Sequence, residues 1–99
     1  MTVRVSWVQA FADLAQGQPG LAASGRTVGE VLAQVAQAHP RLGALLWPQG
    51  RGGAGEPRGA LNPVVVLFLN GQQVRGPEAL AASVRDGDEL MLVSAVEGG

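Results

Sequence analysis

The sequence contains no cysteine. This absence excludes disulfide bonds, thiolate metal sites, thiol nucleophiles and the carriage of a persulfide on a side chain. Lysine is also absent, because every basic residue of the chain is an arginine. The chain therefore cannot form a Schiff base, and it offers no side-chain amine for an isopeptide bond to a copy of itself.

Net charge and long apolar runs are scarce as well. The 99 residues carry a formal net charge of -1, which offers neither a basic field for nucleic acid nor a polybasic patch for anionic lipid. The longest apolar run, residues 64–69, is far too short to cross a bilayer. Residues 1–8 alternate polar and apolar side chains and do not resemble a signal peptide. We therefore expect a cytoplasmic protein that binds neither nucleic acid nor membrane.

Candidate catalytic groups are few and scattered. His39 is the only histidine, and we interpret it as structural because no second histidine or cysteine could share a metal ion with it. Residues 86–89 cluster carboxylates without the spacing of a calcium loop, which favours a solvated turn. The glycine-rich residues 50–55 lack the Gly-Lys-Ser/Thr ending of a phosphate-binding loop. We expect no metal site, no bound cofactor and no catalytic activity in this chain alone.

The first half of the chain predicts two strands followed by helices. Residues 3–7 alternate apolar and polar side chains, as a half-buried strand does. Residues 9–16 favour a short helical turn, and residues 21–24 favour a second strand that forms a hairpin with the first. Residues 41–47 are predicted to form a short helix, and residues 49–57 a surface loop rich in glycine, arginine and proline.

The main helix is predicted to begin at Thr27. Thr27 and Glu30 have the spacing of a capping box, in which each residue's polar atoms satisfy a free backbone N–H of the first turn. The buried stripe is predicted to follow at helical spacing, with Ala38 as its last member; its other members are Val28, Val31, Leu32 and Val35. Pro40 ends this helix or starts the next turn.

The second half predicts three strands and tight turns. Residues 64–69 are predicted to form an apolar strand, and Asn70-Gly71 is a strong hairpin signal. Residues 72–75 are predicted to form the returning strand of this hairpin. Residues 78–84 favour a helical turn or two, and residues 86–88 a turn before the last strand, 89–93. One sheet on one main helix makes an α+β domain of two layers. Because residues 64–69 and 90–93 are apolar at odd and even positions alike, the second sheet face is either covered by this chain or docks a partner.

The last strand leads directly into a tail that ends in two glycines. We expect a domain of residues 1–94 and a flexible tail of residues 95–99, whose members are Ala95, Val96, Glu97, Gly98 and Gly99. The five residues beyond Ser94 reach roughly 17 Å when fully extended. Without a Cβ, the two glycines let the chain pass through a narrow channel, so the terminal carboxylate is the group that reaches furthest.

The order of these elements, the Asn70-Gly71 hairpin, the turn at residues 86–88 and the closing Gly98-Gly99 resemble the ubiquitin-like sulfur carriers of the ThiS/MoaD family. The stretches LNPVVVLFLNGQQVRG and VRDGDELMLVSAVEGG carry most of the resemblance, and TVGEVLAQVAQAHP is similar to the family's first long helix. The resemblance implies a β-grasp fold. The resemblance spans nearly the whole chain, and the long loop before Leu61 resembles that of the longer MoaD-like members, including the CysO-type carriers.

The resemblance also implies a function. An E1-like adenylyltransferase of the MoeB/ThiF type would use ATP to adenylate the Gly99 carboxylate, which would then become a thiocarboxylate. Gly98 would give steric clearance, and Ala95, Val96 and Glu97 would line the entry to the partner, although Glu97 stands where a small residue is usual.

The sulfur would be donated in molybdopterin synthesis, with this chain as the small subunit beside a MoaE-type large catalytic subunit. CysO-type cysteine synthesis, thiamine thiazole formation, tRNA thiolation and the modification of proteins remain open alternatives. A plain β-grasp interaction module, in which the glycines are merely a frayed end, also remains open.

Overall fold

The first strand and its hairpin form where the alternation of side chains predicts them. The computed structural model describes residues 2–47, 61–75 and 78–95. β1 (Val3–Trp7) buries Val3, Val5 and Trp7 on one face. β2 (Gly20–Ala23) runs antiparallel to β1, which confirms the predicted hairpin.

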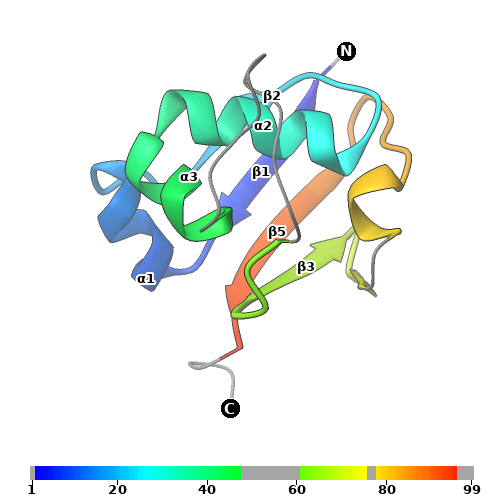
Figure 1. Cartoon of the computed structure of the whole chain (residues 1–99). Helices are drawn as coiled ribbons and strands as arrows, with labels where there is room; N and C mark the ends of the chain where they lie inside the picture. The colour runs from blue at the N-terminus through cyan, green and yellow to red at the C-terminus, as the bar shows by residue number, and fades with distance from the viewer. Residues whose placement is uncertain (1, 48–60, 76–77, 96–99) are drawn as a thin grey trace.

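The five strands form one mixed sheet in the order β2-β1-β5-β3-β4. β3 (Val65–Leu69), β4 (Gln72–Val74) and β5 (Glu89–Ser94) are the strands predicted in the second half of the chain. β1 and β5 are parallel, while β3 is antiparallel to both β4 and β5. The last strand therefore lies in the middle of the sheet (Figure 1), between the first strand and the β3–β4 hairpin.

The β3–β4 hairpin turns at the predicted dipeptide. Asn70 and Gly71 both have positive φ, of 52° and 85°, as a type I′ turn requires, and this turn matches the right-handed twist of the strands. Gly87 is likewise in the left-handed region, with φ of 88°, so the predicted turn at residues 86–88 also forms. Asp88 N closes this turn by donating to Arg85 O at 3.0 Å.

The main helix, α2 (Val28–Ala38), begins at the predicted cap. Glu30 N donates to Thr27 Oγ1 at 3.2 Å. The Glu30 carboxylate does reach back, but it accepts from Arg26 N at 2.9 Å, one residue before the cap itself. The cap thus satisfies one free N–H of the first turn and holds the chain that enters it.

The buried stripe of α2 differs from the prediction at its end. Val28, Val31, Leu32 and Val35 are fully buried as expected, whereas Ala38 is exposed and Ala36 is buried instead. The reason is the next helix, α3 (Pro40–Leu46), which turns back after Pro40 and packs against Ala36. The sequence predicts a second helix here, but it does not show which face of α2 that helix covers.

Short helices complete the helical layer. α1 (Gln9–Ala12) and the 3-10 turn η1 (Asp13–Ala15) occupy the segment predicted to be a helical turn. η2 (Ala79–Ala81) is a single 3-10 turn within residues 78–84. The predicted loop at residues 49–57 lies outside the described residues. No helix among the residues described is both long and apolar enough to cross a bilayer.

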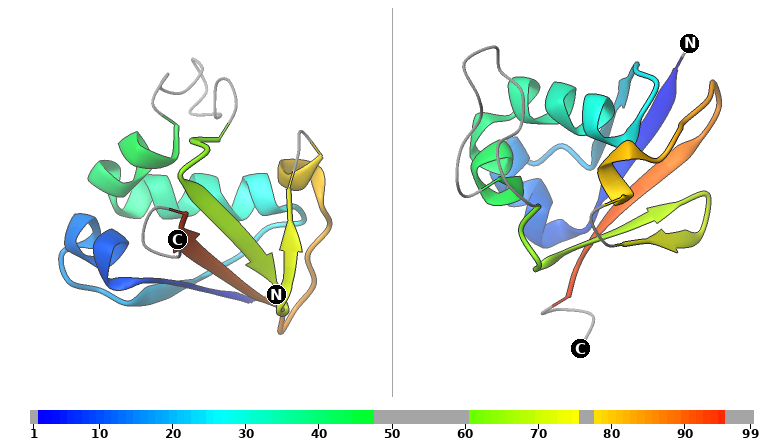
Figure 2. Two further views of the ribbon diagram at one scale, coloured as in Figure 1. Left: turned by 90° about the horizontal axis from the view of Figure 1, so that it is seen from below. Right: turned by 45° about the vertical axis from the view of Figure 1, so that its right-hand side comes forward.

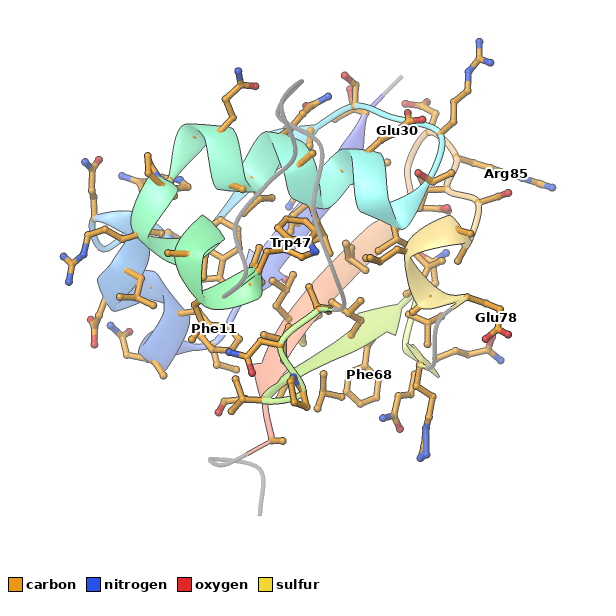
Figure 3. The ribbon with its side chains drawn as sticks, in the orientation of Figure 1. Phe11, Glu30, Trp47, Phe68, Glu78 and Arg85 are labelled. Atoms are coloured by element: carbon orange, nitrogen blue, oxygen red, sulfur yellow. The ribbon has the colours of Figure 1, made fainter. Side chains whose placement is uncertain are left out.

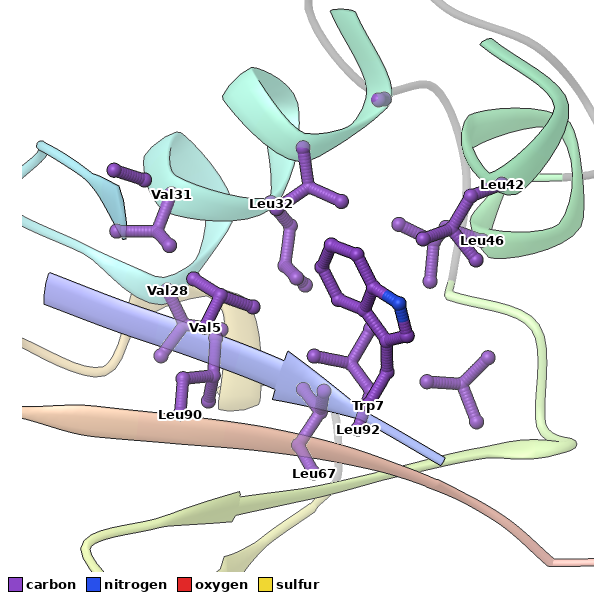
Figure 4. Packing of buried hydrophobic residues seen from close by; sticks show 14 of the residues in the cluster. Val5, Trp7, Val28, Val31, Leu32, Leu42, Leu46, Leu67, Leu90 and Leu92 are labelled. Carbon is purple, nitrogen blue, oxygen red and sulfur yellow. The ribbon is translucent and has the colours of Figure 1, made fainter. Parts of the chain in front are cut away.

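The core lies between the sheet and the α2–α3 layer (Figure 4), where residues of β1, β3 and β5 meet those of both helices. Trp47, just after α3, is 1% exposed, and Trp7 is 6% exposed. Both tryptophans therefore pack in the core. The left view of Figure 2 shows the strands in front, with α2 behind them. The helices thus cover one face of the sheet, as a two-layer α+β domain requires.

Candidate functional site

The tail predicted to carry the chemistry leaves the sheet from a firmly held strand. β5 pairs with β1 on one side and β3 on the other, so it has a neighbour on each edge. Ser94, its last residue, is 5% exposed and lies opposite Val65. Because β1 and β5 are parallel, the chain leaves β5 at the end of the sheet opposite the start of β1 (Figure 1).

Ala95 is the one tail residue that the structure describes. It is exposed, and its backbone N donates to Val64 O at 2.8 Å. Ala95 is therefore attached to the sheet by its backbone while its side chain faces solvent. The other predicted site residues, Val96, Glu97, Gly98 and Gly99, lie outside the described residues.

The sheet face away from the helices carries an apolar cluster, which we call the outer patch: Val66, Phe68, Met91 and Val93. In the β3–β5 pairing Phe68 lies opposite Met91, and Val66 lies opposite Val93. Met91 is 46% exposed and the other three are half-buried. In Figure 3, Phe68 projects on the side of the sheet away from α2, whereas Trp47 lies between the sheet and the helices. This is the excess apolar face that the strand sequences predicted.

Polar residues border the outer patch within the sheet. Ser6 of β1 lies beside Met91, and Gln73 of β4 lies opposite Phe68. Arg4 and Glu89 form the next row, where they lie side by side on neighbouring strands. An apolar centre with a polar rim is the usual composition of a protein-binding surface.

Asn62 is a residue of the site region that the sequence reasoning did not single out. Its Oδ1 accepts from Val64 N at 3.0 Å, and its Nδ2 donates to Leu45 O at 2.9 Å. It therefore ties the end of α3 to the residue that holds Ala95. The Asn62-Pro63 dipeptide, a common start of a turn, was the available signal.

The acidic turn at the far end of the sheet is a hydrogen-bonded structure. The Asp88 carboxylate accepts from Asn70 Nδ2 at 3.1 Å and from Arg85 N at 2.7 Å. These bonds lower the pKa of Asp88 below its ordinary value, with the Asn70 bond contributing most. The turn thus joins the β3–β4 hairpin to the start of β5.

Other candidate groups have structural surroundings. His39 is both the C-cap of α2 and the N-cap of α3. Its ring meets the ring of Trp7 edge-on, with 5.7 Å between the two ring centroids. Across residues 2–47, 61–75 and 78–95, no group of three or more His, Cys, Asp or Glu side chains could hold a metal ion.

Comparison with known families and sequences points to one class of protein. The model of the ThiS family matches residues 8–99. A protein of Archaeoglobus fulgidus, provisionally named a sulfur carrier protein, is 46% identical over 41 residues, which are 41% of this chain and 47% of that protein. This match spans only about half the length of that relative.

Solved structures agree over almost the whole chain. Small archaeal modifier protein 1 from Methanosarcina acetivorans is similar with a TM-score of 0.80 and 26% identity, over 99% of this chain and 96% of that one. A chain of the Amycolatopsis orientalis BexX/CysO complex is similar with a TM-score of 0.77 and 29% identity, over 98% and 99%. These likenesses confirm the β-grasp, ubiquitin-like fold.

Proposed function

Because the chain belongs to the ThiS family of ubiquitin-like sulfur carriers, we propose that it carries sulfur as a thiocarboxylate on Gly99. The observation that supports this most directly is the position of β5. This strand is held on both edges, bears half of the outer patch, and continues through the exposed Ala95 into the diglycine. A partner that docks on the patch is therefore next to the root of the tail.

The chemistry requires activation by another protein. A carboxylate is a poor electrophile, so an E1-like enzyme of the MoeB/ThiF type first joins Gly99 to the AMP of ATP and releases pyrophosphate. Hydrosulfide then attacks the acyl carbon, and AMP leaves with one of the former carboxylate oxygens, so the chain now ends in a thiocarboxylate. A thiocarboxylate on Gly99 carries sulfur without a thiol, which fits a chain that contains no cysteine. Dependence on ATP agrees with the expected location in the cytoplasm.

The remaining tail residues shape the approach. Gly98 has no Cβ, so the last two residues need the smallest channel that a peptide can have. Ala95 and Val96 offer small or apolar contacts at the entry. Glu97 adds a carboxylate one residue before the diglycine, and it selects a partner whose channel mouth tolerates negative charge.

The outer patch is the proposed docking surface for the partners. Its residues on β5, Met91 and Val93, precede Gly99 by at most eight residues, about 28 Å of fully extended chain. The E1-like enzyme and the sulfur acceptor use the same patch in turn, because each must receive the same tail. Because both partners would use one surface, the acceptor cannot bind while the E1-like enzyme is bound.

The acceptor that we propose first is a MoaE-type large subunit of molybdopterin synthase, which the resemblance of the strands and the tail implies. A second candidate function of this chain is that of a CysO-type carrier for cysteine synthesis or that of a protein modifier. The identities of 29% to a chain of the BexX/CysO complex and 26% to a small archaeal modifier protein favour it. All of these share the activated Gly99.

Intact-mass measurement tests the proposal. The chain is incubated with an E1-like enzyme from its own organism, ATP and sulfide, and we expect a mass increase equal to the exchange of one oxygen for sulfur. The same mixture without ATP is the control. The enzyme preparation must first be shown to activate a carrier. If the complete mixture then gives no mass change, sulfur carriage by this chain is rejected.

A further inference from the structure

Asn62 lies where the helical layer, the sheet and the tail meet. The end of α3 lies next to Asn62 in space, and the last carbonyls of a helix lack partners within the helix. Asn62 N donates to Leu46 O at 2.9 Å, and Asn62 Nδ2 donates to Leu45 O at 2.9 Å. One residue therefore satisfies two carbonyls at the end of α3.

The same residue shapes the turn that starts β3. Pro63 restricts the residue before it to extended conformations, and Asn62 Oδ1 then accepts from Val64 N at 3.0 Å. Val65 N donates to Asn62 O at 2.9 Å and closes the turn. This combination of an Asx bond and a β-turn holds Val64 in one position relative to α3.

Val64 in turn holds the root of the tail. Its carbonyl accepts from Ala95 N at 2.8 Å, one residue beyond the paired Val65 and Ser94. A continuous series of hydrogen bonds therefore runs from Leu45 through Asn62 and Val64 to Ala95. The side-chain amide of Asn62 supplies two of its bonds.

We propose that Asn62 is a positioning residue for activation of the tail, acting through Val64 to set where Ala95 leaves the sheet. This inference rests on the proposed function for its catalytic half. Only four residues separate Ala95 from the reacting carboxylate, and they span at most about 14 Å. A shift of the root relative to the outer patch therefore moves Gly99 within the active site of a docked enzyme. Misplacement by 1 Å can slow a reaction up to roughly 100-fold.

The chain offers a matched control in Gln34. Its side-chain amide also joins two segments, because Oε1 accepts from Ser24 N at 3.0 Å and Nε2 donates to Ser24 O. Ser24 directly follows β2, whose end pairs with the start of β1. The Gln34 clasp thus lies at the other end of the sheet from the tail, with the same chemistry.

The first measurement follows amide hydrogen exchange at Ala95 in the free full chain. In Asn62→Ala we expect exchange to become roughly tenfold faster, the effect of losing about one net hydrogen bond. In Gln34→Ala the rate should stay within about twofold of wild type, since that clasp does not reach the tail. Unchanged exchange at Ala95 in Asn62→Ala, or an equal change in Gln34→Ala, would overturn the proposal.

The second measurement is ATP–pyrophosphate exchange by the E1-like enzyme with each carrier. Asn62→Ala should lower kcat about tenfold and leave KM within about twofold, because the docking patch is intact. Gln34→Ala should change neither. A raised KM with normal kcat would contradict a positioning role.

A third variant covers the case in which Asn62→Ala does not fold. Asn62→Asp keeps the acceptor for Val64 N and loses the donor to Leu45 O, so exchange at Ala95 should be faster, and kcat lower, than in wild type. If the enzyme activates no carrier, wild type included, the proposed function fails. Exchange at Ala95 then decides by itself whether Asn62 positions the root of the tail.

Discussion

Gly43 lies where α2 and α3 approach each other most closely. A Cβ built on Gly43 would stand 2.7 Å from Ala36 Cβ and 2.9 Å from Ala36 Cα. Real Cβ atoms do not come so close to other carbons, so any side chain here must push the helices apart. The tight turn between α2 and α3 thus depends on a glycine that helix propensity alone would disfavour.

We expect Gly43→Ala to lower the free energy of unfolding by about 1–3 kcal/mol, the usual cost of overpacking a core. Urea denaturation followed by circular dichroism measures this. Ala44→Gly is the control, since Ala44 is exposed on the same helix and reports the propensity difference, about 1 kcal/mol. A Gly43→Ala protein that is more stable than wild type would show that the helices can separate without cost.

Asp88 couples the stability of the fold to pH. Its hydrogen bonds from Asn70 and Arg85 favour the charged carboxylate and lower its pKa from the ordinary 3.8. The folded state thus holds its proton less tightly than the unfolded state. The stabilisation that the charged Asp88 carboxylate contributes is complete at pH values above the pKa of Asp88 in the unfolded state. It disappears as the pH falls through the pKa of Asp88 in the folded state.

We therefore expect Asp88→Ala to have a lower Tm than wild type at pH 7, with the difference shrinking as the pH falls below about 3.8. Calorimetric scans of both proteins from pH 7 to pH 2 measure it. Glu78→Gln, at an exposed position beside η2, is the control and should keep the wild-type pH profile. A difference that persists unchanged at the acid end would show that Asp88 acts without its charge.

At the scale of the element, β5 presents two chemically similar faces to different surroundings. Leu90 and Leu92 are fully buried against the helices, whereas Met91 between them is 46% exposed. The strand sequence alone did not distinguish these faces, because all of residues 90–93 are apolar. The position of the helices assigns one face to the core and leaves the other face exposed.

Neighbouring residues of β5 should therefore separate stability from binding. Met91→Ala should change the free energy of unfolding by less than about 0.5 kcal/mol and raise KM for the E1-like enzyme about tenfold, as loss of a hot spot does. Leu92→Ala should instead lower the free energy of unfolding by about 2–5 kcal/mol. Denaturation curves and carrier-dependent pyrophosphate exchange measure the two effects.

Gln73→Ala is the control for the docking surface, because Gln73 lies opposite Phe68 on the edge strand but belongs to the polar rim. It should leave KM nearly unchanged. A normal KM in Met91→Ala and in the matching Phe68→Ala would remove the outer patch as the docking surface.

At the scale of the whole molecule, we expect the domain and the tail to have separate tasks. The buried residues of the core come from described elements between β1 and β5, which ends at Ser94. The proposed reaction takes place five residues further on, at Gly99. A change at the end of the tail should therefore abolish chemistry and spare the fold.

Deletion of Gly99 should abolish thiocarboxylate formation and leave Tm within about 1 °C of wild type, because the buried core residues of the described part of the chain all precede Ser94. Intact mass and thermal melting test the two parts. Sulfur loading of the shortened chain would contradict the assignment of the reacting carboxylate. A large fall in Tm would show instead that the tail belongs to the folded domain.

The absence of lysine constrains the alternative function as a protein modifier. Since the chain has no lysine, one copy cannot be joined to the lysine side chain of another. Any adduct on a target should contain one copy for each modified target lysine. Replacing one modified target lysine by arginine should therefore remove the mass of one copy from the adduct in an immunoblot. A ladder that grows from a single target lysine would contradict this.

The sequence by itself determined the local elements and led to the proposed chemistry. Alternation in β1, the cap at Thr27, the Asn70-Gly71 turn and the diglycine are local signals, and the structure forms each described one where the signal lies. The order of strands and helix, with the resemblance, predicted the β-grasp fold. The missing cysteine excluded a thiol as the carrier of sulfur.

Only the tertiary structure decided what depends on contacts between distant segments. The path of α3 determines that Ala36 is buried and Ala38 exposed, and pairing of β3 with β5 brings Phe68 beside Met91 on the open face. Asn62 gains its role because the end of α3 and the start of β3 meet in space. Local sequence specifies backbone conformation, but these contacts form only when separate elements pack together, so no single stretch of sequence contains them.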